Sequence, residues 1–325
     1  MKSQRRIRKL LYVCAILLLS AMLLYSGFQV LQGITQQKVP ERVETKTITR
    51  DGVDYFPRQD ITVFLVMGID QLGKVEDSET YNNHGAADMV ALLVFDEKEQ
   101  VCNVLQLNRD TMLDMPVIGV GGKPAGSYFG QLALSHTYGS GLEDSCENTK
   151  KAVSDLLYKT HIDYYVAMNM DAIGILNDAV GGVTVTVTED FSQIDPTIGK
   201  GQVTLMGEQA INYVRTRKDV GDQLNITRMD RHTAYMESFL SAFQAKQDGS
   251  DRFAADVYED VADYLVSDCS VTVISQVISR YADYTLGDVI TPKGENVLGE
   301  TYFEFYADEE DLDRLILDLF FAPKR

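Results

Sequence analysis

Several features that mark common functional classes are missing from this 325-residue chain. It has no Trp, only 7 Pro and only 4 Cys, and it contains neither a Cys-x-x-Cys pair nor the ligand spacing of a zinc site. There is no Gly-x-Ser-x-Gly elbow, and the 4 His residues show no i, i+4 spacing. Serine-hydrolase and zinc-hydrolase chemistry therefore have little support. The glycine-rich residues 119–130 lack the Lys-Ser/Thr ending of a phosphate loop, so we expect a flexible loop there.

Positive charge is also scarce. The chain has 30 Lys and Arg against 48 Asp and Glu, a formal charge of −18, which argues against a nucleic-acid binder with a broad basic face. Residues 1–9 nevertheless hold five basic residues and no acid, so the rest of the chain sums to −18 − 5 = −23. With 45% hydrophobic residues the chain is predicted to fold, as one large domain or two small ones.

The only long apolar run follows this basic start. Residues 10–31 form a 22-residue stretch without charge, long enough as a helix to cross a bilayer core of about 30 Å. The positive-inside rule then leaves residues 1–9 in the cytoplasm and sends the remainder outside. A cleaved signal peptide is the alternative, but the run exceeds its usual core of about 7–15 residues. No second such run is present, which excludes a channel or transporter core.

The exported part is predicted to have two sections. Polar residues 32–60 form a stalk, and residues 61–325 form one extracellular domain, which includes the segment 268–325. Three Cys residues lie in this part, so at most one disulfide can form. Cys102 with Cys146 is one possibility, and three buried thiols are the other.

Strand-like and helix-like segments alternate through the domain, which predicts a layered α/β fold. The turn at residues 96–99 indicates that the second and third strands form a hairpin. The predicted strands are 61–69, 89–95, 101–107, 162–168 and 183–187, and the predicted helices are 143–158, 171–180, 207–215, 229–243 and 251–266.

Two carboxylates lie at the two ends of the segment that connects the first two predicted strands. Asp70 directly follows one strand, and Asp88 directly precedes the next. If the two strands are neighbours, both carboxylates reach the same edge of the sheet, where a pair of hard oxygen ligands suits Mg²⁺. The alternative for each is a turn or helix-capping role.

Basic residues gather in two places. Arg109 directly follows the third strand, at the kind of strand end where α/β sheets collect ligands, although a local pair with Asp110 is the alternative. Residues 213–231 then hold five basic residues within nineteen positions. Arg215 and Arg217 alternate along the chain, and Arg228 and Arg231 lie three apart on one helical face. Their guanidinium groups suit phosphate oxygens, with a solvated surface helix as the alternative.

The motifs occur in an order that resembles the LytR-CpsA-Psr family of bacterial cell-wall enzymes. The series is GID, ADMV, LNRDTM, HTYGSG, IDYYVAMNMDAIGILNDAVGGVTVTV, LMGEQAINYVRTRK, GD and RMDR, and the match is strongest over residues 60–245. The resemblance implies a single α/β/α domain with a twisted central mixed sheet and an apolar tunnel for a lipid tail. It also implies a phosphotransferase, anchored in the membrane of a Gram-positive-type envelope, that moves a polyprenyl-diphosphate-linked anionic glycopolymer of teichoic acid or capsular type onto peptidoglycan.

The resemblance also assigns roles to individual residues. Asp70 and Asp88 correspond to carboxylates that bind Mg²⁺. The arginines correspond to groups that bind the substrate diphosphate, the first three of them catalytic: Arg109, Arg215, Arg217, Arg228 and Arg231. The chain departs from the family pattern at five positions, where other residues replace two Arg, a Lys, an Asn and a Gln: Gln71, Ala86, Gln131, Ala133 and His232.

Two other functions use the same residues. A metal-dependent hydrolase of lipid-linked diphosphates would have the same cluster with water as acceptor. A non-catalytic wall-binding or regulatory membrane protein would tolerate loss of Asp70 and Asp88. The residue that takes the acceptor's proton is not identified by sequence, and Asp110 and Asp222 are the nearest candidates.

Overall fold

A computed structural model describes most of the chain after the predicted anchor. The described residues are 47–119, 121–216, 220–221, 225–247, 249, 253–269, 280–281 and 284–324. The predicted tail and transmembrane segment, residues 1–31, lie outside them. Within the described part of the chain, no helix is long and apolar enough to cross a membrane.

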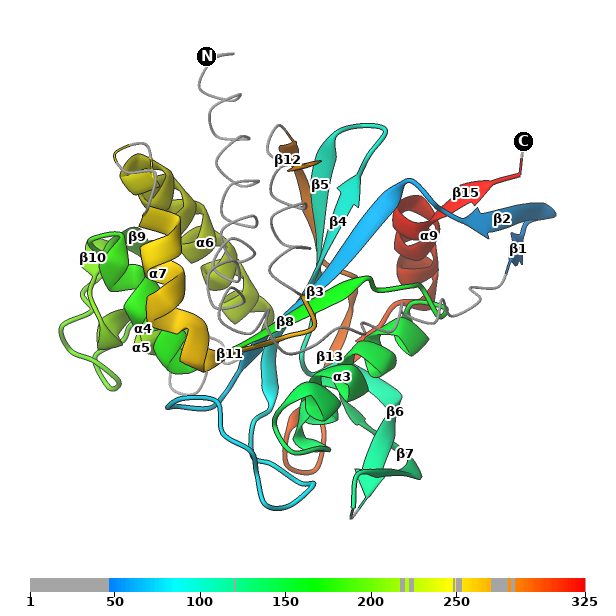
Figure 1. Ribbon diagram of the computed structural model, residues 1–325, viewed down its shortest axis with the longest axis horizontal. Coiled ribbons are helices and arrows are strands. Elements are labelled where there is room, and N and C mark those ends of the chain that lie inside the picture. Colours follow the sequence, from blue (N-terminus) through cyan, green and yellow to red (C-terminus); the bar gives the residue numbers. More distant parts are fainter. Residues whose placement is uncertain are drawn as a thin grey trace, which may run out of the picture.

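A six-stranded mixed sheet forms the centre of the molecule (Figure 1). Neighbouring strands β3 and β4 are antiparallel, as are β4 and β5, whereas β8 runs parallel to β3 and β12 parallel to β5. The predicted hairpin and the mixed sheet are thus confirmed. In spatial order the strands are β11 (Leu265–Ser267), β8 (Tyr164–Asn169), β3 (Ile61–Ile69), β4 (Ala87–Asp96), β5 (Val101–Leu107) and β12 (Thr285–Ile290).

The central strands are apolar on both faces because both faces are covered. On one face, Leu65 and Leu92 pack against α3 and α9 through Val153 and Ile316. On the other face, Phe95 stacks on Tyr281 with ring centroids 4.3 Å apart. The covering elements of the first face are the short helix η1 (Leu132–Thr137), α3 (Glu143–Leu156) and α9 (Glu309–Phe320).

A second group of helices lies beyond the β8 end of the sheet (Figure 1). It has its own apolar core, which reaches the sheet through Val166 and includes a chain of rings from Tyr213 through Tyr235 and Phe239 to Phe243. Its elements are α4 (Met170–Ala179), β9 (Val183–Val187), β10 (Gly201–Leu205), α5 (Glu208–Arg215), α6 (Asn225–Gln247) and α7 (Phe253–Val261). This arrangement places the C-terminal end of α5 and the N-terminal end of α6 beside the ends of β3 and β4.

The glycine-rich segment is not a flexible loop, and that prediction was wrong. Strands β6 (Met112–Gly119) and β7 (Lys123–Gln131) form an antiparallel hairpin there. Gly121 and Gly122 in its turn have φ of 83° and 70°, values that glycine adopts without strain. Most of β7 is exposed on both faces, so it lacks the apolar alternation by which a strand is recognised in a sequence.

Part of the predicted stalk belongs to the folded domain. Strands β1 (Ile48–Arg50) and β2 (Val53–Pro57) pair with each other, and β2 also pairs with β15 (Phe321–Pro323) near the end of the chain. The domain therefore includes residues 48–57, which the sequence had assigned to the stalk. The partner strand lies more than 260 residues away, so no local pattern reveals this pairing.

The last part of the chain adds two further elements. One is a hairpin of β13 (Gly294–Leu298) and β14 (Phe303–Ala307), which contacts β6. The other is the segment after α7: the predicted helix 251–266 ends early, at Val261, and is followed by η2 (Ala262–Tyr264) and β11. Cys102, Cys146 and Cys269 are free thiols, so the suggested disulfide between Cys102 and Cys146 was wrong. Cys102 and Cys146 are buried, as the alternative predicted, whereas Cys269 is only partly buried. Burial raises the pKa of Cys146 and Cys269, which makes both poor nucleophiles.

Candidate active site

A β-bulge near the ends of the central strands β3 and β4 sets the position of Asp88. Gly68 pairs with Met89 and Ile69 pairs with Ala87, so Asp88 is the extra residue on β4. Bulges of this kind redirect a side chain from the regular alternation of a strand. The Asp88 carboxylate is almost fully buried, with 6% of the residue exposed, although it lies only one residue inside the strand.

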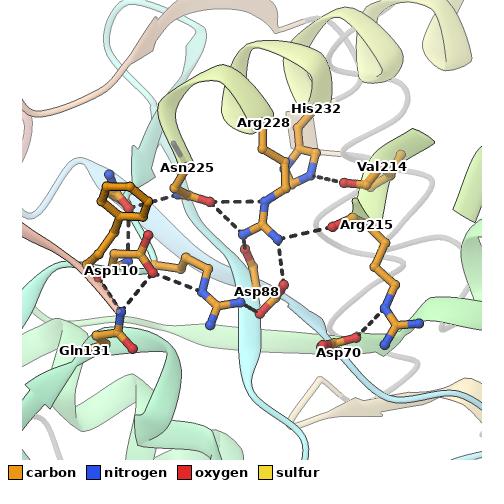
Figure 2. A network of polar contacts seen from close by, with 12 residues as sticks. Asp70, Asp88, Asp110, Gln131, Val214, Arg215, Asn225, Arg228 and His232 are labelled. Atoms are coloured by element: carbon orange, nitrogen blue, oxygen red, sulfur yellow. Dashed lines mark hydrogen bonds and ion pairs between the residues drawn. The ribbon is translucent and has the colours of Figure 1, made fainter. Parts of the chain in front are cut away.

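Two arginines neutralise this buried carboxylate (Figure 2). Arg228 Nη1 lies 2.6 Å from Asp88 Oδ2, and Arg228 Nη2 donates to the Asp88 carbonyl oxygen at 3.0 Å. Arg109 Nη1 contacts the other carboxylate oxygen, Oδ1. Arg228 itself is 2% exposed. A charge can be buried to this extent only when it is paired and hydrogen-bonded, so the two arginines and Asp88 stabilise each other's ionised forms.

Two asparagines connect the arginines across separate elements. Asn225, the first residue of α6, accepts from Arg228 Nη2 at 2.6 Å and from Nε at 3.1 Å through Oδ1. Its Nδ2 donates to Asn108 Oδ1 at 2.9 Å, and the same Asn108 oxygen accepts from the Asp110 amide. The start of α6 is thereby joined to the turn that carries Arg109. Neither asparagine was among the predicted site residues, because a buried amide network carries no sequence signature.

The ion pair of the second carboxylate, Asp70, is more exposed to solvent. Arg215 is the last residue of α5, and its Nε donates to Asp70 Oδ1 at 2.7 Å (Figure 2). The two side chains are 43% and 32% exposed. An exposed ion pair of this kind contributes little to stability.

Asp110 lies behind Arg109 and is fully buried. Gln131 Nε2 donates to Asp110 Oδ1 at 3.1 Å and to the Phe303 carbonyl oxygen at 2.7 Å. Arg109 Nε lies 3.4 Å from the same carboxylate oxygen. Gln131, one of the departures from the family pattern, therefore connects the arginine turn to β14.

Among the described residues, Arg231 pairs with the carboxylate of Glu189 and not with Asp70 or Asp88. Its Nη1 lies 3.2 Å from Glu189 Oε1, and its guanidinium lies over the rings of Phe191 and Tyr213 at 5.4 and 6.0 Å. Burial lowers the pKa of Arg231, and the Glu189 charge opposes that shift. Of the predicted residues, the structure thus brings together Asp70, Asp88 and the arginines Arg109, Arg215 and Arg228. Arg217 and Asp222 lie outside the described residues.

The ends of β3 and β4 thus bring together three guanidinium groups, those of Arg109, Arg215 and Arg228, with the carboxylates of Asp70, Asp88 and Asp110 in a mixed α/β sheet. Residues 25–315 match the LytR_cpsA_psr family, so the chain belongs to this family.

Two relatives and two solved structures show the extent of the likeness. The polyisoprenyl-teichoic acid–peptidoglycan teichoic acid transferase TagU of Bacillus subtilis is 26% identical over 196 residues, which are 60% of this chain and 56% of the relative. TagU of Halalkalibacterium halodurans is 27% identical over 79% of this chain and 77% of the relative. A Streptococcus agalactiae protein superposes with a TM-score of 0.64 at 20% identity, over 80% of this chain and 86% of its own. The structure of TagT bound to LI-WTA superposes with a TM-score of 0.57 at 21% identity, over 80% of this chain and 90% of its own. The structural likeness shows the fold.

Proposed function

We propose that this protein transfers an anionic glycopolymer from a polyprenyl diphosphate carrier to peptidoglycan. The observation that carries the proposal is the convergence of Arg109, Arg215 and Arg228 on two carboxylates at one sheet end. Family membership supports it, as do the TagU relatives, which are named as teichoic acid transferases that act between a polyisoprenyl carrier and peptidoglycan. The polymer class, teichoic or capsular, is part of the proposal.

The reaction needs little covalent chemistry from the protein. A hydroxyl oxygen of peptidoglycan attacks the phosphorus next to the glycopolymer, and the bond from that phosphorus to the bridging oxygen breaks, so polyprenyl phosphate leaves. The hydroxyl proton passes to the released phosphate or to the solvent. Phosphoryl transfer of this type is accelerated mainly by positioning and by neutralisation of charge on the phosphate oxygens. Arginine guanidinium groups supply both, because they bind phosphate oxygens with a fixed, planar geometry.

The arginines divide by exposure into two roles. Arg228 is buried against Asp88 and Asn225, so it holds the carboxylate and not the substrate. Arg215 is nearly half exposed and bound to an exposed carboxylate, so it is the group that turns to the diphosphate. Arg109 is 15% exposed, which is between the exposures of Arg228 and Arg215. It lies beside Asp88 and Asp110, where it stabilises charge on the leaving oxygen.

Mg²⁺ belongs to the same proposal. The described residues contain no cluster of three or more His, Cys, Asp or Glu able to hold a metal. Asp70 nevertheless fits this ion, because Mg²⁺ is commonly held by one or two carboxylates while substrate phosphates and water complete its shell. Bound there, the ion would supply further neutralisation of the diphosphate. Asp70 is the more available ligand, because Asp88 has an arginine at each of its two oxygens.

The location also remains a proposal. We infer that residues 10–31 anchor the chain in the cell membrane with its N-terminus in the cytoplasm, which puts the arginine site on the outer side where peptidoglycan lies. Support comes from the charge distribution, with five basic residues before the apolar run and −23 after it.

Full-length protein in lipid vesicles, given a lipid-linked polymer and purified peptidoglycan, tests this function. We expect polymer covalently attached to peptidoglycan, and loss of attachment in Arg215→Ala. If the wild-type protein releases free polymer and attaches none to peptidoglycan, it is a hydrolase. Unchanged substrate and no product would leave only a binding role.

A further inference from the structure

One face of α6 binds three successive backbone carbonyls at the end of α5. His232 Nε2 donates to the Val214 oxygen at 2.9 Å, and Arg228 Nη1 lies 3.4 Å from the Arg215 oxygen (Figure 2). Arg231 Nη2 donates to the Thr216 oxygen. Because a carbonyl oxygen only accepts, these contacts require the hydrogen of His232 to be on Nε2.

These carbonyls belong to the part of a helix that lacks internal partners. The last C=O groups of an α-helix have no N–H one turn further on, and a C-terminal glycine or water usually satisfies them. Here the residue after α5 is Thr216, with an extended backbone at φ −71° and ψ 131°. Three side chains of α6 take the place of the missing cap.

Neither Arg231 nor His232 is available to bind phosphate. Arg231 is 5% exposed and is enclosed by Glu189, Phe191 and Tyr213. His232 is 8% exposed, and burial lowers its pKa to about 3, so the ring is neutral. Their only polar partners among the described residues are Glu189 and the carbonyls of Val214 and Thr216.

We propose that Arg231 and His232 are positioning residues, which fix the backbone of residues 214–216 so that the Arg215 side chain is held over the sheet end beside Asp70. This rests on the proposed function, because it assumes that Arg215 acts on the diphosphate. It removes Arg231 from the set of phosphate ligands that the sequence resemblance implied. The contacts act through Arg215, which lies one residue from each of the two outer carbonyls.

The residue at 232 can be varied to separate the hydrogen bond from the packing. The family pattern has Gln where this chain has His232, and a Gln amide offers a donor of similar reach. In His232→Leu the donor is lost while the apolar volume remains. We expect kcat for polymer transfer to fall about 10- to 100-fold in His232→Leu, as is typical when a supporting contact of a reactive group is removed. His232→Gln should recover to within about 3-fold of wild type.

Tyr235 provides the matched control on the same helix. It is similarly buried, and its hydroxyl donates to Asn177 Oδ1 of α4 at 3.0 Å. Tyr235→Phe removes one buried hydrogen bond and should lower the melting temperature while kcat stays within about 2-fold of wild type. If Tyr235→Phe lowers kcat as much as His232→Leu does at a similar loss of melting temperature, the contacts of His232 are merely structural and the proposal is overturned.

A double-mutant cycle tests the route through Arg215. In an Arg215→Ala background, His232→Leu should cost less than about 3-fold, because the group that it positions is already absent. A full additive loss would contradict the proposal. If His232→Leu does not fold, Arg231→Lys takes its place in the cycle, since it keeps the charge beside Glu189 but loses the planar fork.

The proposed function can fail separately. If the wild-type protein shows no transfer, the same variants are titrated with inorganic pyrophosphate by calorimetry. Loss of affinity in His232→Leu that matches the loss in Arg215→Ala, with recovery in His232→Gln, supports the positioning role whatever the reaction is. Wild-type affinity in His232→Leu contradicts it.

Discussion

Arg228 and Asp88 form a buried ion pair between α6 and the bulge on β4, with Nη1 2.6 Å from Oδ2 and each side chain less than 10% exposed. The pair joins the helical group to the central sheet at the point where the other site residues meet. It therefore affects both stability and the geometry of the site.

Loss of the Asp88 carboxylate should destabilise the protein strongly. Asp88→Leu leaves the buried Arg228 guanidinium without its carboxylate, and breaking a buried pair on one side typically costs about 3–5 kcal/mol of unfolding free energy. Asp70→Leu, at the exposed pair with Arg215, should cost less than about 1 kcal/mol. Urea unfolding of both variants in the same detergent measures the difference, and equal losses would show that Asp88 is not the structural member of the two.

Arg215 should matter for transfer and not for stability. Removal of a group that stabilises charge in the transition state commonly costs about 10²–10³-fold in rate, whereas an exposed ion pair adds little to folding. Arg215→Ala should accordingly lose polymer transfer with an unchanged unfolding midpoint. Arg314→Ala, which removes an exposed arginine paired within α9, is the matched control and should retain full transfer.

Gln131 should stabilise the arginine turn and β14 together. Gln131→Leu removes an amide donor from the buried Asp110 carboxylate and from the Phe303 carbonyl. Loss of hydrogen bonds to buried groups costs about 1–3 kcal/mol, so we expect a destabilisation in this range. Hydrogen exchange should also become faster at the amides of β13 and β14. Unchanged protection of that hairpin would argue against the connection.

Two buried histidines should make the fold sensitive to acid. Burial lowers the pKa of His136 to about 4 and that of His232 to about 3. Both values lie below the 6.5 of an exposed imidazole, so the unfolded chain binds the protons more tightly. Their contribution to stability is complete above about pH 6.5 and is lost as the pH falls toward 3–4.

The contribution of His232 can be isolated by difference. Burial raises the pKa of Asp268 and Glu147, which acts in the opposite direction, but these groups are common to all variants. The free energy of unfolding of His232→Gln should therefore fall less than that of wild type between pH 6.5 and pH 4. Parallel pH profiles would show that His232 is not buried in its neutral form.

Local patterns in the sequence were sufficient for much of the fold. Apolar runs and turns predicted the central strands and the hairpin of β4 and β5, because these strands are buried on both faces. The exposed β7 and the pairing of β2 with β15 were missed, because neither leaves a periodic apolar pattern. The bulge at Asp88 is likewise set by tertiary packing and not by a local motif.

At the site too, the sequence predicted some features correctly and could not predict others. Motif order pointed to Asp70, Asp88, Arg109, Arg215 and Arg228, which do meet. Arg231 shares a helical face with Arg228, and spacing alone could not show that it turns to the end of α5.

The fate of the diphosphate tests the central claim most directly. Lipid-linked polymer labelled with ³²P only at the phosphate next to the glycopolymer is incubated with full-length protein and peptidoglycan. The account predicts that the label becomes covalently attached to peptidoglycan with the polymer, while unlabelled polyprenyl phosphate is released, and that Arg215→Ala slows both about 10²–10³-fold. Label that leaves with the lipid as polyprenyl diphosphate, or attachment at the wild-type rate in Arg215→Ala, would contradict phosphoryl transfer at this arginine site.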